Sequence, residues 1–225
     1  MADDLPGRVL KEARDAFRRG AHEEALEKYL WFHHNALAHN LAYAGVRLSY
    51  AITEWINLGS AYPPAREALE LIQNENRRAL EEGSLDFSQF HDFAAINECL
   101  GRFDLTCSVF AALAKREPEF AKKCIYSALS AVIRTGQFAL ARQFFESPSL
   151  DNALTSFASF LNQRDRSKLY DDALIGVHAK LLRLRASVFE GVGEAEGARL
   201  LQATAIAALS DSADQEEIRR QLLWR

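Results

Sequence analysis

The side chains best able to do chemistry in this sequence are its histidines and cysteines, which bind metals and act as bases or nucleophiles. His34 and His39 lie five residues apart. On one helix that spacing turns the two rings in different directions, whereas helical zinc sites use histidines four residues apart. Cys99, Cys107 and Cys124 include no C-x-x-C pair and therefore lack zinc-site spacing. The histidines are interpreted as packing or surface residues, and no metal site is predicted.

Other catalytic patterns are equally incomplete. A Cys–His pair needs two side chains that converge in space, which sequence spacing does not show. Gly191, Gly193 and Gly197 resemble a phosphate-binding loop, but no strand precedes them, so we interpret them as a turn between helices. We therefore assign no catalytic, cofactor-binding or metal-ligating residue and predict a protein that is not an enzyme. An enzyme with a site assembled across several helices is kept as an alternative.

Composition narrows the class of protein. Of the 225 residues, 48% are hydrophobic and 26% charged, which allows one large domain with a substantial core. The net charge of −4 disfavours a dedicated nucleic-acid binder. Three cysteines in a long chain indicate reduced thiols rather than a disulfide framework. The N-terminus has no secretory apolar run, and no stretch is long and apolar enough to span a bilayer, so a cytoplasmic protein without membrane contact is expected.

Apolar residues recur at steps of three and four almost everywhere, as on one face of an amphipathic helix. Strict alternation is rare, so the fold class is predicted to be all-α, with about 11–12 helices. The expected ranges are 5–19, 22–38, 42–58, 64–82, 87–100, 103–116, 118–135, 137–146, 149–162, 170–190, 194–209 and 212–223.

Residues typical of helix ends mark these boundaries. Glycines suit C-terminal ends, where a left-handed residue is often required, prolines suit first turns, and Asp or Ser suits N-caps. The expected boundary residues are Gly20, Gly59, Gly101, Gly136, Gly191, Gly193, Pro63, Pro64, Pro118, Pro148, Asp86, Ser147 and Asp211. Short connections make consecutive helices antiparallel.

The surroundings of four turn glycines recur along the chain. Gly20, Gly101, Gly136 and Gly193 serve as reference positions. The residues seven positions before these glycines are Ala13, Ala94, Leu129 and Ala186. Those five positions after them are Ala25, Thr106, Ala141 and Ala198. Those nine positions after them are Tyr29, Phe110, Phe145 and Gln202. Small residues let crossing helices approach closely, and a large aromatic one turn later fills the gap against the next pair. The pattern predicts repeated helix hairpins.

These fragments resemble the tetratricopeptide repeat (TPR) family. Segment 19–29 looks like the second half of a repeat, while Trp55, Leu58-Gly59 and Tyr62 match its first half. Further matches are Phe110 followed by Pro118, segment 136–141 and segment 193–198. Pro63 and Pro64 depart from the pattern, because a regular repeat would continue its helix there. The resemblance implies antiparallel hairpins stacked into a TPR-like right-handed α-α superhelix, as one domain over residues 1–225, with 212–223 as a C-terminal capping helix.

TPR-like proteins hold an extended peptide in a concave groove lined by the first helix of each pair. Carried onto this sequence, the resemblance assigns groove-facing side chains to all four hairpins, with three arginines making the groove somewhat basic. Two further aromatics, Trp31 and Tyr43, are suspected of partner contact because aromatics often form interface hot spots. The predicted partner-binding residues are Arg14, Phe17, Trp31, Tyr43, His91, Tyr126, Ser130, Arg134 and Arg183.

The sequence thus predicts a non-catalytic protein–protein interaction scaffold that binds a peptide or helix of an unidentified partner protein. A homodimer is a further possibility, since the terminal helix could mediate docking instead of capping. The alternative is a nucleic-acid-linked regulator that uses the basic stretch 164–185, where six basic residues outnumber three acidic ones. Salt-sensitive RNA or DNA binding would distinguish that alternative.

Overall fold

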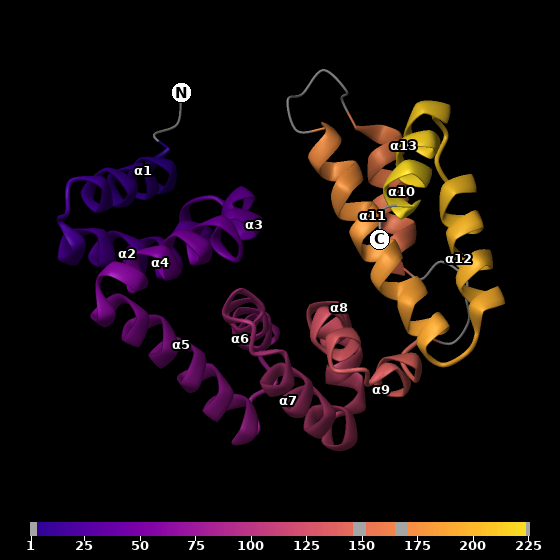
Figure 1. Ribbon diagram of the computed structural model, residues 1–225, viewed down its shortest axis with the longest axis horizontal. Helices are drawn as coiled ribbons and strands as arrows, with labels where there is room; N and C mark the ends of the chain where they lie inside the picture. The colour runs from indigo at the N-terminus through magenta and orange to yellow at the C-terminus, as the bar shows by residue number, and fades with distance from the viewer. Residues whose placement is uncertain (1–3, 146–151, 165–170, 224–225) are drawn as a thin grey trace. The chain divides into compact units, whose positions relative to one another are not determined.

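The computed structural model describes residues 4–145, 152–164 and 171–223, and these are helical with no strand (Figure 1). The all-α prediction is confirmed for this part of the chain. Two compact units, residues 1–116 and 117–225, divide the chain and are described separately. A single domain over residues 1–225 stays a prediction. None of the described helices is long and apolar enough to cross a membrane.

The first unit is a series of antiparallel helices around an aromatic core. Tyr29 stacks on Trp55 with ring centroids 6.2 Å apart, and the indole Nε1 of Trp55 donates a hydrogen bond to the Ala65 carbonyl at 2.7 Å. This bond joins two consecutive helices. The elements are α1 (Leu5–Arg18), α2 (His22–His39), the 3-10 helix η1 (Leu41–Tyr43), α3 (Ala44–Arg47), α4 (Tyr50–Ala61), α5 (Pro63–Glu81), α6 (Phe87–Leu100) and α7 (Phe103–Arg116).

The second unit centres on one long helix, α11, which the other helices of the unit pack around. Gly191, the last residue of α11, lets that helix meet α9 closely, because a Cβ there would overlap the ring of Phe138. The elements are α8 (Pro118–Arg134), α9 (Phe138–Arg142), α10 (Asn152–Gln163), α11 (Asp171–Gly191), α12 (Ala195–Ala207) and α13 (Ser212–Leu223). The bounds of the final helix agree with the predicted range 212–223.

The largest departure from the predicted helices falls within 42–58. This range is divided among η1, α3 and α4, with a turn at Leu48 and Ser49. The break lets Arg47 point inward, where its guanidinium meets the carboxylate of Asp92 on α6. In a continuous helix, the direction of the Arg47 side chain would be set by its position along that helix. Here it is set by the ion pair with Asp92. Helix α9 is also shorter than the predicted 137–146.

The predicted boundary residues act largely as expected. Gly20, Gly101, Gly136 and Gly193 have φ between 70° and 84°, the left-handed conformation that ends a helix. Prolines begin α5 and α8, and the side chains of Asp86 and Asp211 accept hydrogen bonds from the first-turn amides of α6 and α13. Ser147 and Pro148 lie outside the described residues.

Gly59 and Gly191 are the exceptions among the predicted glycines, because neither has a positive φ. Gly191 is the last residue of α11 and permits the close approach of α9 described above. Gly59 is the clearer departure. It lies inside the last turn of α4, where a Cβ would come within 3.0–3.2 Å of Cβ, N and Cα of Arg66 on α5. Its prediction as a C-terminal left-handed residue is wrong, because its function is to permit close approach of two helices. The break after Tyr62 agrees with the departure from the TPR pattern, since α4 ends at Ala61 and α5 starts at Pro63.

The recurring positions around the turn glycines form the packed layers of the hairpins. The small residues seven before and five after each glycine are buried, as are three of the four residues nine after it. The fourth, Gln202, is only half-buried. The packing explanation of the repeat therefore holds at all positions but one, and that position lies beside a groove.

Candidate functional site

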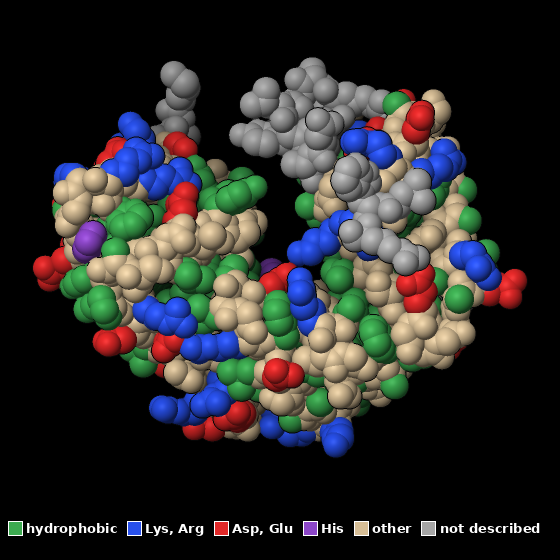
Figure 2. Space-filling view, in the orientation of Figure 1, with side chains coloured by type: hydrophobic (Ala, Val, Ile, Leu, Met, Phe, Trp, Pro, Cys, Tyr) green, Lys and Arg blue, Asp and Glu red, His purple; other side chains and the backbone are tan. Residues whose placement is uncertain are grey.

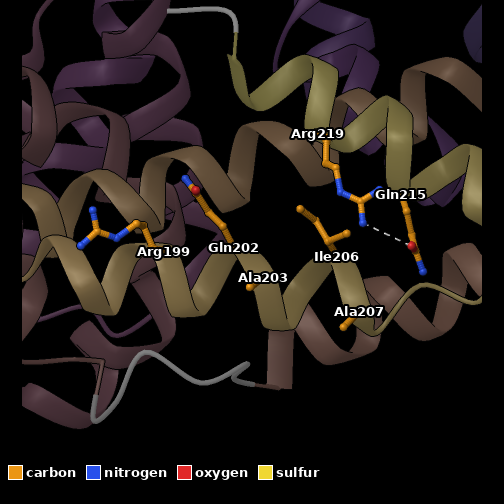
Figure 3. A pocket seen from close by; sticks show the side chains of 7 residues that line it. All are labelled: Arg199, Gln202, Ala203, Ile206, Ala207, Gln215 and Arg219. Carbon is orange, nitrogen blue, oxygen red and sulfur yellow. Dashed lines mark hydrogen bonds between the residues drawn. The ribbon is translucent and has the colours of Figure 1, made fainter.

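A groove opens between α12 and α13 in the second unit. Its cavity volume is about 580 Å³, and it is open to solvent (Figure 3). Helix α12 supplies one wall with a partly apolar surface, and α13 supplies the other with two polar side chains one turn apart. The lining residues are Arg199, Gln202, Ala203, Ile206, Ala207, Gln215 and Arg219.

The groove exists because the last repeat lacks its aromatic residue. At the aligned position of the other three repeats, Tyr29, Phe110 and Phe145 are each no more than 2% exposed. Gln202 occupies the same place in the fourth repeat and lines the cavity instead. A glutamine side chain has less apolar surface than an aromatic ring and does not fill this space. The floor of the groove is therefore formed by Ile206, which is half-buried.

Helix α13 is anchored mainly on α11, which leaves its side toward α12 open. Ile218 of α13 is fully buried. From α11, Nη1 of Arg183 donates a hydrogen bond to the carbonyl of Gln221 at 3.3 Å. These contacts fix α13 from behind without filling the groove. The exposed Leu200, three residues before Ala203, extends the apolar surface of α12 beyond the groove.

The two groove arginines are not neutralised by described carboxylates. Arg199 makes no ion pair with a described residue, although Glu196 stands one turn before it, and Arg219 makes only a 3.4 Å contact with an amide oxygen. Arg220, the next residue along α13, pairs with Glu217 at 2.7 Å. Both groove arginines are exposed, and no acidic side chain lines the cavity. The groove is therefore positively charged.

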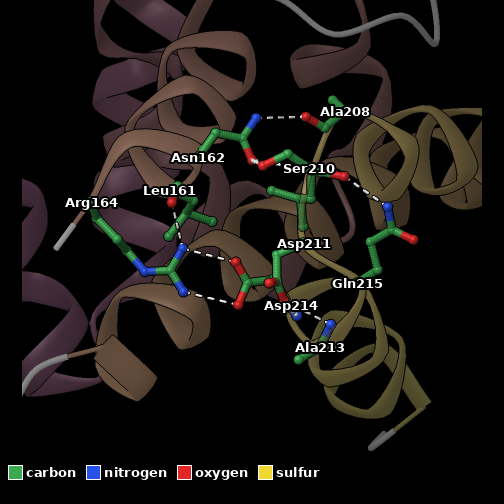
Figure 4. A network of polar contacts seen from close by, with 10 residues as sticks. Leu161, Asn162, Arg164, Ala208, Ser210, Asp211, Ala213, Asp214 and Gln215 are labelled. Atoms are coloured by element: carbon green, nitrogen blue, oxygen red, sulfur yellow. Dashed lines mark hydrogen bonds and ion pairs between the residues drawn. The ribbon is translucent and has the colours of Figure 1, made fainter. Parts of the chain in front are cut away.

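A polar network holds the loop between α12 and α13 in place (Figure 4). Oδ1 of Asn162, near the end of α10, accepts hydrogen bonds from the backbone N and the Oγ of Ser210 at 2.8 and 3.0 Å. Nδ2 of Asn162 donates to the Ala208 carbonyl at 2.9 Å. At the groove wall, Nε2 of Gln215 donates to the Leu209 carbonyl at 2.7 Å. The loop that sets the spacing of the two helices is thus bonded on both sides.

A buried ion pair completes this support. The guanidinium of Arg164 donates two hydrogen bonds to Asp214, at 2.8 and 2.9 Å, and both side chains are at most 5% exposed. Arg164 also donates to the carbonyl of Leu161 at 2.5 Å. Because Asp214 lies in the first turn of α13, the pair ties the start of that helix to the end of α10. Paired Arg–carboxylate forks are directional as well as strong.

The first unit contains a separate buried ionic cluster. Asp92 accepts hydrogen bonds from Arg47 at 2.5 and 2.9 Å and lies 3.4 Å from Nε2 of His33. Burial raises the pKa of Asp92, but the hydrogen bonds from His33 and Arg47 outweigh burial and hold that pKa below its ordinary value. All three side chains are little exposed, and the Nη atoms of Arg47 are bonded within the cluster while its Nε has no hydrogen-bond partner. We interpret the cluster as a fastening of α3 to α2 and α6.

Several other ionisable groups are shifted by burial. The pKa of His91 is lowered by burial, and that of His34 by burial together with the nearby charges of His33 and Arg47. Burial raises the pKa of the Cys124 thiol to about 12, so this cysteine stays protonated and unreactive. No group of three or more metal-ligating side chains occurs among the described residues.

His178 is the most isolated of these groups. It is fully buried on α11, its ring stacks on Phe157 with centroids 5.0 Å apart, and neither ring nitrogen has a hydrogen-bond partner in the structure. Burial lowers its pKa. The imidazole is therefore a neutral core residue, as the sequence interpretation of the histidines expected.

A second cavity, of about 280 Å³, lies between α5 and α7 in the first unit. Its one basic side chain, Arg116, already donates hydrogen bonds to the carbonyls of Leu80 and Glu81 at 2.8 and 3.2 Å. These bonds cap the C-terminal end of α5. The arginine of this cavity therefore has a structural role, whereas no such role is seen for the arginines of the groove between α12 and α13.

The predicted partner-binding residues of the first unit make internal contacts. Arg14 donates to both carboxylate oxygens of Glu54, at 2.9 and 3.0 Å, and acidic and basic side chains lie close together over α1 in Figure 2. The hydroxyl of Tyr43 donates to the carboxylate of Asp4 at 2.7 Å. Three further residues, Phe17, Trp31 and His91, are half-buried. Their rings pack in tilted pairs against His22, His39 and Phe87, with centroids 5.8, 5.5 and 5.4 Å apart. Their binding role stays a prediction.

The predicted residues of the second unit lie on α8 and α11. Tyr126 and Ser130 are half-buried on α8, and Arg134 is exposed at the end of the same helix. Tyr126 packs edge-on against Phe145 at 6.0 Å. Arg183 is half-buried and contacts α13 from behind the groove. None of the four lines the groove, and their binding role also stays a prediction.

The basic stretch 164–185 is less exposed than a nucleic-acid surface would need. Of its described basic residues, Arg164 and Arg185 are buried, and the guanidinium of Arg185 lies over the ring of Phe145 at 4.6 Å. Lys180 is exposed and Arg183 half-buried. Arg166 and Lys168 lie outside the described residues. The nucleic-acid alternative therefore loses two of the cations on which it was based, although no finding tests it directly.

Sequence reasoning missed the groove residues Arg199 and Arg219. The signal that could have located them is the departure at Gln202, the only one of the four aligned positions that is not aromatic. A missing large side chain at a position that otherwise fills a gap predicts a hollow beside it. The exposed arginines on the flanking turns would then have been the natural candidates.

Comparison of the chain with protein-family models, with curated proteins and with solved structures finds no match. The likeness to TPR proteins thus rests on the fragments in the sequence and on the helix hairpins described above.

Proposed function

We propose that this protein is a non-catalytic interaction scaffold of TPR-like helix hairpins, which binds a segment of a partner protein. The observation that carries the proposal is the groove between α12 and α13. It is open, it has an apolar floor, and its two arginines pair with no described carboxylate. Its volume of about 580 Å³ lies within the usual range for binding pockets.

The construction of the groove supports binding rather than loose packing. Its two walls are held by a bonded loop and a buried ion pair, so little ordering is required when a ligand enters. Gln202 offers a free amide that can donate to and accept from a peptide backbone. Ile206 and Leu200 offer the apolar contact that would anchor a side chain of the partner.

Selection from a display library of random short peptides tests the proposal. The full chain is immobilised, and selected peptides are measured again on a Gln202→Phe variant, in which an aromatic ring fills the groove. Binding should fall by about tenfold or more, because the ring displaces the ligand. Thr204→Phe is the matched control, since Thr204 is exposed on the same helix but does not line the groove. If no selected peptide distinguishes Gln202→Phe from Thr204→Phe, the proposal is wrong.

A further inference from the structure

The charge of the groove specifies its ligand. Resting on the proposed function, we infer that the groove between α12 and α13 binds an acidic segment of a partner protein, whose carboxylates pair with Arg199 and Arg219 and whose apolar side chain contacts Ala203 and Ile206. The occupant is thus a peptide with acidic residues flanking an apolar one.

The inference rests first on unused positive charge. Among the arginines of the second unit, Arg142, Arg164 and Arg220 donate to carboxylates within 3.0 Å. Arg199 and Arg219 pair with no described carboxylate, and they are the two that line the groove. Guanidinium groups bind carboxylates through paired hydrogen bonds. An acidic ligand would therefore supply carboxylate partners for these two arginines.

The arrangement of the groove residues supports a peptide rather than a nucleic acid. In Figure 3, Arg199 lies toward one end, Arg219 comes from the facing helix and lies beside Ile206, and Ala203 lies between Arg199 and Ile206. Seven residues separate Arg199 from Ile206, a rise of about 10 Å along the helix. An apolar floor between two isolated cations suits a side chain flanked by carboxylates. A phosphate backbone requires a continuous run of cations, and the chain as a whole carries a net charge of −4.

The neighbouring acidic residues do not compete for these arginines. Glu196 lies one turn before Arg199 and forms no ion pair with it, and Glu216 is exposed on α13 outside the groove. Glu217 is held by Arg220 and by the amide of Gln221, at 2.7 Å for each. Occupation of the groove by an acidic peptide would therefore not displace an existing ion pair.

The test compares the peptides selected by three versions of the full chain. The native protein should enrich peptides with excess Asp and Glu, and Arg199→Glu/Arg219→Glu should enrich Lys- and Arg-rich peptides instead. Arg220→Glu is the matched control, adjacent to Arg219 but outside the groove, and should keep the acidic preference. Circular dichroism checks that each variant is folded.

A quantitative assay then measures the dissociation constant of a labelled peptide that has glutamates on either side of a leucine pair. The same peptide with glutamine in place of each glutamate is the comparison. Arg199→Gln or Arg219→Gln should each weaken binding of the glutamate peptide by up to about fivefold, which corresponds to the upper end of the range for one exposed ion pair. Added salt should weaken it further.

Three results would overturn the inference, and they differ from failure of the proposed function. Groove-dependent peptides without acidic excess, or an unchanged preference in Arg199→Glu/Arg219→Glu, would show a peptide groove that ignores charge. Equal displacement of the peptide by a single-stranded RNA oligonucleotide would show a phosphate site. Absence of any peptide sensitive to Gln202→Phe would instead remove the proposed function itself.

Discussion

Removal of Asp214 should loosen the whole support of the groove. The variant Asp214→Ala leaves the guanidinium of Arg164 buried, with side-chain exposure of only 3% and with two hydrogen bonds lost. Breaking one partner out of a buried ion pair costs about 3–5 kcal/mol. A hydrogen bond to the Leu161 carbonyl is kept and satisfies part of the guanidinium, so we expect the lower half of that range.

Hydrogen exchange measured by mass spectrometry locates this effect. Amides of α13 and of the loop at 208–211 should exchange faster by about a hundredfold, the factor that corresponds to about 3 kcal/mol. Amides of α1 in the first unit serve as the internal reference and should not change. Urea unfolding followed by circular dichroism should show a lower midpoint for the transition of the second unit.

The double variant Arg164→Met/Asp214→Leu separates the ion pair from its burial. With both charges removed, no uncompensated ion stays in the core, so the double variant should be more stable than Asp214→Ala alone. Glu217→Ala, which breaks an exposed pair on the same helix, should leave exchange in the loop unchanged. A double variant less stable than Asp214→Ala, or unchanged exchange in Asp214→Ala, would refute the reasoning.

Two further predictions concern the core of the second unit. Burial lowers the pKa of His178, so the unfolded chain binds a proton more readily, and stability should fall as pH drops below about 6.5. His178→Leu should reduce that acid loss in urea titrations at several pH values; an identical pH dependence would argue against a neutral ring stacked on Phe157. Gly191→Ala should destabilise by about 1–3 kcal/mol because its Cβ overlaps Phe138, whereas Gly176→Ala in the same helix should stabilise by up to about 1 kcal/mol. Thermal melts compare the two, and equal effects would contradict the close contact.

The groove also shows how one substitution at a recurring position can leave a hollow between helices. Helix hairpins of this kind close their gaps with an aromatic residue, as at Phe110 and Phe145. Replacement of that aromatic by Gln202 leaves the core of the hairpin intact, since Ala198 and Leu201 stay buried, while the next helix is kept apart. If the proposed function is right, the binding groove results from the absence of one aromatic side chain, while the core of the hairpin is kept.

The helices themselves could be predicted because their causes are local. Apolar spacing, the N-cap of Asp86, the proline at the start of α8 and the left-handed Gly101 act within a few residues of where they stand. The predicted range 103–116 is the observed α7, and 212–223 is α13. Local causes are also why the recurring small residues could be placed in the core.

Tertiary structure decided the rest, because it depends on residues far apart in the chain. Arg47 leaves the predicted helix to meet Asp92, forty-five positions away, and Gly59 serves a neighbouring helix rather than its own end. The same holds for the basic residues of 164–185: whether Arg164 faces solvent or a carboxylate depends on Asp214, fifty positions away. The sequence by itself determined which segments are helices and where they end, since those are short-range effects of backbone and side chain. Which charged side chains are paired inside the fold and which stay exposed followed only from packing.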